Sequence, residues 1–498
     1  MLSEKRIRRR SIAAAAGRSR RDVARPEGAP RVIILAGGVG AQMRSAVPKV
    51  LHRVGGRTLL EAVLSAAHGL NPSRVVVALG PGGEPIRDAF AGQAIVFDGP
   101  RPSPGAGDAV RHALDSLGPG DGPTLVLAGD TPLLRFETLA SLVERRRRRG
   151  LDLALLSFRP PDPGDFGRVV RDARGRVRRV ADAKSASARD RKIAEVSAGV
   201  YCFAPGAIEL ALGPQKAKPV AEELPLAAAV ETLVRSGGRV EAVAAADWRE
   251  AWTVQTRRDL AATEEIEHRR RIEGALDAGA TVIDPLTTRV GLRVKIEPDV
   301  VLHPFVCLEG ETSLSEGVEV LPFTRIVDST LSPGAVVGPH CELEGARVGP
   351  RCRVGPFARL RPGTVLEEDV RVGNFVETKN TVLHPGVKAL HLAYLGDAAV
   401  GANSNIGAGV ITCNYDGLKK NHTEIGEGVF VGSDSQLVAP VTVGRGAYVG
   451  AGATITEDVP EGALALSRVA QTNVEGWVEK RKKKLEARRA TETGKNGK

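Results

Sequence analysis

The chain has 498 residues and a formal net charge of +11 at pH 7. This length exceeds the size at which one hydrophobic core stops growing, so we expect at least two domains. The apolar runs are too short for a membrane-spanning helix or a signal peptide, and the five cysteines form no CxxC pair, which argues against a disulfide framework or a zinc ribbon. These features predict a soluble, intracellular protein with reduced thiols and no membrane insertion.

The excess positive charge lies at the two ends of the chain. Residues 1–31 carry ten Lys and Arg against three acids, and residues 477–498 carry nine against three. Subtracting these +7 and +6 contributions from +11 leaves a net charge of −2 for the stretch between them. Because the centre of the chain is nearly neutral, we expect no nucleic-acid partner and interpret residues 1–30 and 477–498 as solvated, disordered basic tails.

Residues 31–152 alternate short β-branched runs with helical stretches. Strands are expected at 32–35, 75–77 and 125–127, and helices at 58–70, 106–117 and 136–149. This alternation predicts a doubly wound, Rossmann-like α/β domain, which we extend over residues 31–254. A charged helical stretch follows, and we assign 255–279 as a linker helix between domains.

From residue 280 onward, aliphatic residues recur every six positions. The longest runs with this spacing are Ile296, Leu302, Leu308, Leu314, Val320 and Ile326; Val348, Val354, Leu360, Leu366 and Val372; and Ile425, Val431, Leu437, Val443, Val449 and Ile455. An amphipathic helix would need spacings of three and four. The pattern therefore predicts a parallel β-helix of hexapeptide repeats over residues 280–476, with three hexapeptides in each triangular coil.

Several long motifs occur in order in this second half. They are GPFARLRPG (355–363), VGNFVETKN (372–380), LHLAYLGDA (390–398), NIGAGVITCNYDG (405–417) and VGSDSQLVAP (431–440). With them, residues 31–477 resemble the bifunctional N-acetylglucosamine-1-phosphate uridylyltransferase/glucosamine-1-phosphate N-acetyltransferase family of bacterial cell-wall precursor synthesis. The resemblance implies a left-handed β-helix, a cytoplasmic homotrimer, and acetyl-transfer sites between subunits.

Acetyl transfer to an amine requires a base with a pKa near 7, and binding a sugar phosphate requires cations. His391 lies in a polar interruption of the hexapeptide pattern, and the resemblance implies that it is the general base, with Glu377 orienting or polarising it. It also implies that Arg361 and Lys379 bind the sugar phosphate, which suits a forked guanidinium and a compact ammonium.

The resemblance implies further contacts in the same half. Tyr394 and Asn405 complete the sugar site. The acetyl-CoA groove is formed by Ala408, Asn414, Tyr415, Ser433, Ala451 and Arg468. The stretch 419–422 departs from the usual family sequence, so we expect a modest effect on cofactor affinity.

The N-terminal half carries a glycine-rich loop, LAGGVGAQMRSAVPKVLH (35–52), and the tripeptide AGD (128–130) after two of the expected strands. Such a loop can surround phosphates with backbone N–H groups. The resemblance implies that Lys49 meets the phosphates of UTP and that Asp130 and Gln255 hold Mg²⁺. It assigns the remaining nucleotide-sugar contacts to Gly38, Gly105, Gly167, Asp182 and Ser197.

The same half departs from the family pattern. Gln42 stands where the family has a charge-stabilising arginine, and no uracil-recognising glutamine precedes Arg101. The other departures are Ala106 for threonine, Asp182 for glutamate, Ser197 for asparagine and Gln255 for asparagine. Because losing one preorganised donor costs on the order of a hundredfold to a thousandfold in rate, we expect weak or absent uridylyl transfer.

Three hypotheses follow. The first is a bifunctional enzyme that acetylates glucosamine 1-phosphate and then makes UDP-N-acetylglucosamine and diphosphate from UTP. The alternative is an acetyltransferase only, with a non-catalytic, nucleotide-sugar-binding N-terminal domain. A third class, a metal-dependent carbonic anhydrase, would need three converging histidines, and His384 and His391 have no third partner at matching spacing.

Overall fold

A computed structural model describes residues 27–38, 40–99, 105–182, 185–213, 225–467 and 470–495. The chain divides into two compact units, one ending at Arg270 and one beginning at Arg271. The predicted disorder of residues 1–26 lies outside the described residues, as do Arg101 and Arg468.

The described part of the first unit is built on one mixed sheet of nine strands. Its main path runs β11-β7-β10-β6-β1-β4-β5, with the β8–β9 hairpin beside β10. The strands are β1 (Arg31–Leu35), β4 (Arg74–Ala78), β5 (Val96–Asp98), β6 (Thr124–Ala128), β7 (Leu153–Phe158), β8 (Arg168–Arg171), β9 (Val177–Ala181), β10 (Val196–Phe203) and β11 (Val240–Ala244); β2 (Arg53–Val54) and β3 (Arg57–Thr58) pair separately. β1 lies parallel between β4 and β6, whereas β10 is antiparallel to β6 and β7.

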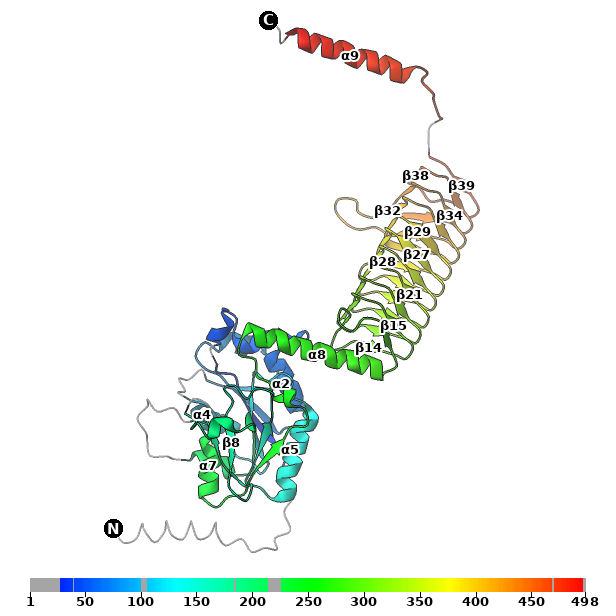
Figure 1. The fold of residues 1–498 in the computed structure, drawn as a ribbon. Coiled ribbons are helices and arrows are strands. Elements are labelled where there is room, and N and C mark those ends of the chain that lie inside the picture. Colours follow the sequence, from blue (N-terminus) through cyan, green and yellow to red (C-terminus); the bar gives the residue numbers. More distant parts are fainter. Residues whose placement is uncertain are drawn as a thin grey trace, which may run out of the picture. The chain divides into compact units, whose positions relative to one another are not determined.

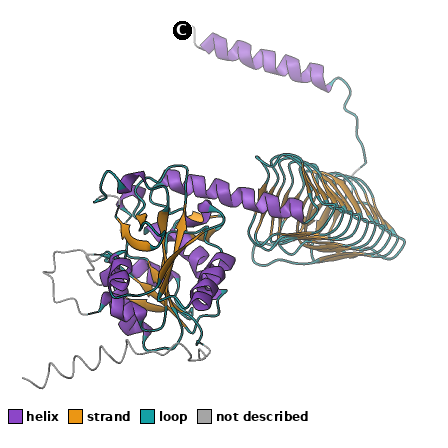
Figure 2. Ribbon diagram, turned by 60° about the horizontal axis from the view of Figure 1, so that its bottom comes forward, coloured by secondary structure: helices purple, strands orange, loops and turns teal. Residues whose placement is uncertain are grey.

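Helices cover both faces of this sheet, as Figure 2 shows. They are α2 (Leu59–His68), α3 (Glu84–Ala89), α4 (Ala106–Leu117), α5 (Phe136–Arg149), α6 (Ala207–Leu212) and α7 (Ala228–Arg235), with short 3₁₀ turns η1 (Ala41–Met43), η2 (Lys49–Leu51), η3 (Asp190–Lys192) and η4 (Trp248–Ala251). α2 begins at a capping box in which the Thr58 hydroxyl accepts from the Glu61 N–H and the Glu61 carboxylate accepts from the Thr58 N–H. The predicted α/β domain is confirmed.

The second unit is a long parallel β-solenoid (Figure 1). Its first sheet contains β12 (Thr281–Val282), β15 (Val301–Leu302), β18 (Glu319–Val320), β21 (Val336–Val337), β24 (Arg353–Val354), β27 (Arg371–Asn374), β29 (Lys388–His391), β31 (Asn405–Ile406), β34 (Phe430–Val431), β37 (Tyr448–Val449) and β39 (Leu464–Ala465). Its second sheet contains β13 (Arg289–Val290), β14 (Lys295–Ile296), β16 (Cys307–Glu309), β17 (Ser313–Leu314), β19 (Arg325–Val327), β20 (Thr330–Leu331), β22 (Glu342–Glu344), β23 (Arg347–Val348), β25 (Arg359–Leu360), β26 (Val365–Leu366), β28 (Glu377–Leu383), β30 (Tyr394–Val400), β32 (Ile411–Cys413), β33 (Thr423–Ile425), β35 (Gln436–Val438), β36 (Val441–Val443) and β38 (Thr454–Ile455).

The six-residue period has a direct structural cause. Leu302 pairs in register with Val320, so equivalent positions of adjacent coils stack, and each coil turns one aliphatic side chain inward from every face. Leu302, Leu308, Leu314, Val320 and Ile326 are all buried in one continuous core. The predicted hexapeptide β-helix is confirmed.

Two further helices lie outside the sheets. α8 (Arg257–Asp277) falls within the stretch expected to form a linker helix, and the boundary between the two units lies inside it. α9 (Trp477–Lys495) corrects the prediction of a disordered C-terminal tail, because this basic segment is helical. Its residues through Arg489 are exposed. None of the helices in the described ranges combines the length and apolar content that crossing a bilayer requires.

Candidate active sites

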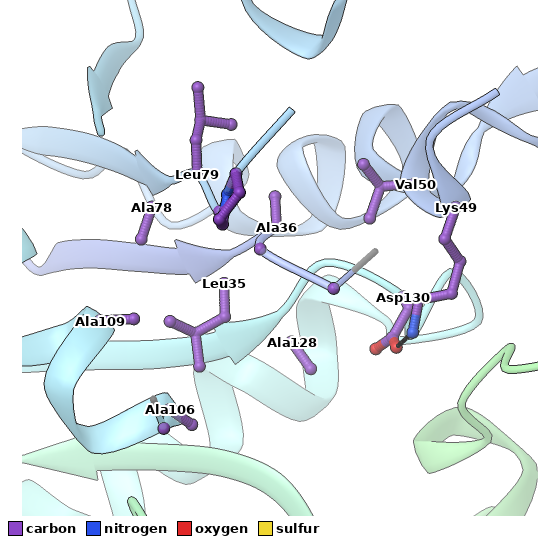
Figure 3. A pocket seen from close by; sticks show the side chains of 15 residues that line it. Leu35, Ala36, Lys49, Val50, Ala78, Leu79, Ala106, Ala109, Ala128 and Asp130 are labelled. Atoms are coloured by element: carbon purple, nitrogen blue, oxygen red, sulfur yellow. Dashed lines mark hydrogen bonds and ion pairs between the residues drawn. The ribbon is translucent and has the colours of Figure 1, made fainter. Parts of the chain in front are cut away.

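The first unit contains a cavity of about 360 Å³ where β1, β4 and β6 end (Figure 3). Its lining residues are Leu35, Ala36, Gly37, Gly38, Lys49, Val50, Ala78, Leu79, Gly80, Pro81, Gly105, Ala106, Ala109, Ala128 and Asp130. Carboxyl ends of parallel strands are the usual ligand position in open α/β sheets. Two glycine loops approach each other here, since a Cβ on Gly80 would lie 2.3 Å from the Gly37 carbonyl oxygen.

Three side chains form a closed hydrogen-bonded group at this cavity. Lys49 Nζ donates to Asp130 Oδ2 at 2.5 Å and to Gln255 Oε1 at 2.9 Å, and Gln255 Nε2 donates to Asp130 Oδ2 at 2.9 Å. Figure 3 shows the Lys49 and Asp130 side chains pointing toward each other. The Val254 N–H donates to the Asp130 carbonyl at 2.9 Å, which brings Gln255 beside the carboxylate. The structure thus joins residues that are more than 200 positions apart in sequence.

Two of the other residues predicted to contact the nucleotide sugar line the cavity, and three do not. Gly38 and Gly105 line the cavity, whereas Gly167, Asp182 and Ser197 are not among its described lining residues. The Ser197 N–H donates to the Gly167 carbonyl at 2.8 Å, so these two lie together, and Asp182 is exposed.

Gln42 is exposed on η1, next to the cavity's glycine loop in sequence. Sequence reasoning missed a cation near it. Arg257 Nε donates to the carbonyl oxygen of Met43, the residue after Gln42, at 3.3 Å, and Arg257 Nη1 lies 3.3 Å from His52 Nδ1. Burial and the adjacent Arg257 charge lower the pKa of His52 below its usual value. The sequence did offer one indication of this cation, because Arg257 follows the predicted metal ligand Gln255 by two residues.

In the solenoid, register brings the predicted sugar-phosphate residues together. Glu377 pairs with Tyr394 on adjacent coils, and Arg361 Nη1 donates to Glu377 Oε1 at 2.8 Å. Lys379 pairs with Gly396 in the same ladder. The ammonium of Lys420, reinforced by the charge of Arg361, lowers the pKa of Lys379. This concentration of cations favours an anion such as a phosphate.

Lys420 and Asp397 are residues that sequence reasoning missed. Lys420 Nζ lies 3.6 Å from Asp397 Oδ2, and the Asn414 amide donates to the same oxygen at 2.5 Å. Asn414 is buried and also lies 3.5 Å from the Tyr394 hydroxyl. The departing stretch 419–422 therefore carries a charge at the candidate sugar-phosphate site.

His391 is exposed at the end of β29, and its Nδ1 lies 3.2 Å from Asn374 Oδ1. Asn374 lies on the preceding coil, where it pairs in register with His391. The predicted orienting residue, Glu377, hydrogen-bonds Arg361 in this structure, and Asn374 contacts the histidine. Asn405 lies on the next coil of this sheet, where it pairs with Lys388.

Three of the residues predicted to contact acetyl-CoA lie on successive turns of the solenoid, C-terminal to His391. The Asp434 N–H donates to the Ala408 carbonyl at 2.7 Å, and the Gly452 N–H donates to the Ser433 carbonyl at 2.8 Å, so Ala408, Ser433 and Ala451 follow one another along the solenoid. Tyr415 is exposed on the loop between β32 and β33, which projects from the solenoid in Figure 1. Hydrogen bonds from the loop backbone and Asn421 hold the pKa of Asp416 in this loop at about 2.

Comparisons with known proteins agree with this two-part architecture. Residues 32–199 match the MobA-like NTP transferase domain, and residues 422–457 match six repeats of the bacterial transferase hexapeptide. The chain is 43% identical to the bifunctional protein GlmU of Ralstonia nicotianae, covering 92% of this chain and 100% of the relative. It is 46% identical to a Thermus thermophilus protein of the same name, covering 89% of this chain and 97% of the relative.

The chain belongs to the GlmU family of bifunctional proteins. The family predicted from the motifs is thus confirmed, and the chain is an enzyme with two transferase activities, one for the acetyl group and one for the uridylyl group. In this GlmU family member, the NTP transferase match lies within the unit that holds the glycine-loop cavity, and the hexapeptide match covers part of the solenoid.

Proposed function

We propose that the solenoid transfers the acetyl group of acetyl-CoA to glucosamine 1-phosphate at the corner that carries Arg361, Lys379 and His391. The cation cluster carries this proposal. The Arg361 N–H donates to the carbonyl of Thr378, the residue before Lys379. Lys379 pairs in register with Gly396, and Lys420 Nζ lies 3.6 Å from the neighbouring Asp397, so the three cations lie near one another. A phosphate bound there would offset their mutual repulsion and would place the sugar near His391 and Asn414.

His391 is suited to act as the general base. Because Asn374 Oδ1 is a hydrogen-bond acceptor, its contact with His391 Nδ1 favours the tautomer with the proton on Nδ1. Nε2 is then free to take a proton. In the proposed step the sugar nitrogen attacks the thioester carbonyl, His391 Nε2 accepts a proton from that nitrogen, and the sulfur of coenzyme A leaves and is protonated.

We propose that the second reaction, uridylyl transfer from UTP to N-acetylglucosamine 1-phosphate, takes place in the cavity of the first unit. The carboxylate of Asp130 and the amide oxygen of Gln255 are hard oxygen ligands of the kind that Mg²⁺ prefers. Bound there, Mg²⁺ would neutralise phosphate charge. Lys49, whose ammonium contacts both of these oxygens in this structure, would turn to the phosphates, and the glycine-loop N–H groups would surround them.

We also propose the cytoplasmic homotrimer that the family resemblance implies. The solenoid exposes a column of stacked rings, Phe305, Phe323, His340, Phe357 and Phe375, with centroids 4.8 to 5.4 Å apart. Exposed apolar surface of this kind often lies in an interface between subunits. The molar mass of the purified protein in solution tests this proposal, and a monomeric mass would contradict it.

The site assignment is tested by Lys379→Gln. A charge-assisted hydrogen bond contributes about 1.5–3 kcal/mol, so KM for glucosamine 1-phosphate should rise by about tenfold to a hundredfold while KM for acetyl-CoA stays near its original value. Lys388→Gln is the matched control, because Lys388 is an exposed lysine on β29, the next strand along the chain, which belongs to the other sheet. Equal effects of the two substitutions would contradict the assignment of the phosphate to Lys379.

A further inference from the structure

We propose that Asp397 is a positioning residue for acetyl transfer, which fixes the Asn414 amide with its oxygen turned toward the acceptor amine. This inference rests on the proposed acetyl transfer in the solenoid. The Asp397 carboxylate lies between Lys420 and Asn414, and it would act by orienting Asn414 without touching the reacting atoms.

Both oxygens of Asp397 have polar partners. Oδ1 accepts from Asn380 Nδ2 at 2.7 Å, and Oδ2 accepts from Asn414 Nδ2 at 2.5 Å, with Lys420 Nζ 3.6 Å from the same Oδ2. The Asp397 side chain is 14% exposed. Its partial burial raises the carboxyl pKa, but the hydrogen bonds from the two asparagines and the Lys420 charge outweigh this effect and lower the pKa of Asp397.

An ionised carboxylate can only accept hydrogen bonds, so it selects one of the two orientations of the Asn414 amide. The NH₂ group of Asn414 must face Asp397, and its oxygen must therefore face the other way. Asn414 is 6% exposed, which restricts its movement. An amide oxygen that accepts one N–H of the acceptor amine would hold the nitrogen lone pair toward the thioester carbonyl, as nucleophilic attack requires.

The backbone conformation explains why Asp or Asn occupies positions 397 and 380. Asp397 and Asn380 occupy stacked turns of adjacent coils and have φ angles of 49° and 47°. Asp and Asn are the non-glycine residues that tolerate this left-handed region best. An exchange of Asp and Asn between the two positions therefore changes the hydrogen-bond pattern without straining either turn.

The test is steady-state acetyl transfer by the full-length Asp397→Asn variant. An asparagine at 397 can both donate and accept, so either orientation of the Asn414 amide becomes compatible with it and the fixed orientation is lost. Since a misplacement of about 1 Å can cost about a hundredfold in rate, we expect kcat to fall by about that factor while KM for glucosamine 1-phosphate changes much less. Asp369→Asn is the matched control: Asp369 occupies a left-handed turn at φ 60° and pairs with the exposed Arg351.

A compensating exchange separates orientation from charge. In the double variant Asp397→Asn, Asn380→Asp, the new Asn can donate to the new Asp and can still accept from Asn414. We expect this variant to recover most of the lost kcat.

Three results would overturn the inference and leave the proposed function standing. The first is an Asp397→Asn enzyme with the original kcat and KM. The second is a raised KM with unchanged kcat, which would make Asp397 only a counter-ion of the phosphate-binding cations. A folded double variant, with the original thermal midpoint, that recovers no kcat would also contradict it. If the double variant does not fold, the split between kcat and KM in the single variant decides. Absence of acetyl transfer in the unsubstituted protein would overturn the proposed function itself.

Discussion

The C-terminal part of α8 and the residues that follow it should stabilise the solenoid by capping its first coil. Ile272, Ala275 and Ala280 are 3%, 6% and 7% exposed and belong to the solenoid core. A fragment that begins at Thr281 would lose all three, whereas a fragment that begins at Arg271 would keep them. Burial of an Ile side chain contributes about 1.5–3 kcal/mol and each alanine methyl contributes about 0.8 kcal/mol, so the shorter fragment should be less stable by roughly 3–5 kcal/mol as an upper estimate.

The assay is urea unfolding of both fragments at one subunit concentration, because association shifts apparent stability. Both fragments should acetylate glucosamine 1-phosphate under native conditions, since stacked repeats bury their own core. In the longer fragment, Ile272→Ala should reproduce most of the loss. Glu273→Ala is the control, because Glu273 is exposed on the same helix. Equal stability of the two fragments would refute the capping role.

Three further predictions concern His391, the pair Gln42 and Gln255, and His52. His391→Ala should abolish acetyl transfer and leave uridylyl transfer intact, because His391 lies in the solenoid; an equal loss of both activities would argue against separate sites. Gln42→Arg together with Gln255→Asn should raise the turnover of UTP without changing acetyl transfer, because it restores a charge toward the triphosphate and the shorter metal ligand; an unchanged UTP rate would place the missing charge elsewhere, for example at Arg257. His52 has a lowered pKa in the fold, so the unfolded chain takes up a proton first on acidification. The stability of the first unit should therefore be complete above about pH 6.5, the usual pKa of histidine, and should decrease below it, and His52→Gln should flatten this dependence in thermal unfolding.

The solenoid could be predicted from the sequence because its period is a direct record of packing. One inward aliphatic per hexapeptide is enough to define each face, and residues such as Leu308 and Val354 are buried as that pattern requires. The α/β sheet was similarly visible, since the buried strands β1, β4 and β6 are continuous apolar runs flanked by helices.

The pairing between coils could not be predicted in the same way. His391 meets Asn374 because the two lie 17 positions apart, one fewer than three full hexapeptides. Lys420 approaches Asp397 from the loop between β32 and β33, which interrupts the six-residue count. The Lys49–Asp130–Gln255 group likewise depends on where Val254 joins the Asp130 backbone.

The C-terminal tail shows a different limit. Its high charge favoured disorder, but the segment is rich in Lys, Arg, Glu, Ala and Leu, which are also the strongest helix formers. Composition alone therefore does not distinguish a solvated helix from a disordered tail.

The central claim is that two separate sites in one chain carry out acetyl and uridylyl transfer, with the acetyl group transferred in the solenoid. Its most direct test is to supply the purified fragment that begins at Arg271 with glucosamine 1-phosphate and acetyl-CoA and to follow N-acetylglucosamine 1-phosphate and free coenzyme A. The account predicts that both products form at a rate close to that of the full chain, with no UTP present. Formation of neither product by a folded fragment, while the full chain is active, would show that acetyl transfer needs the first unit and would contradict the claim.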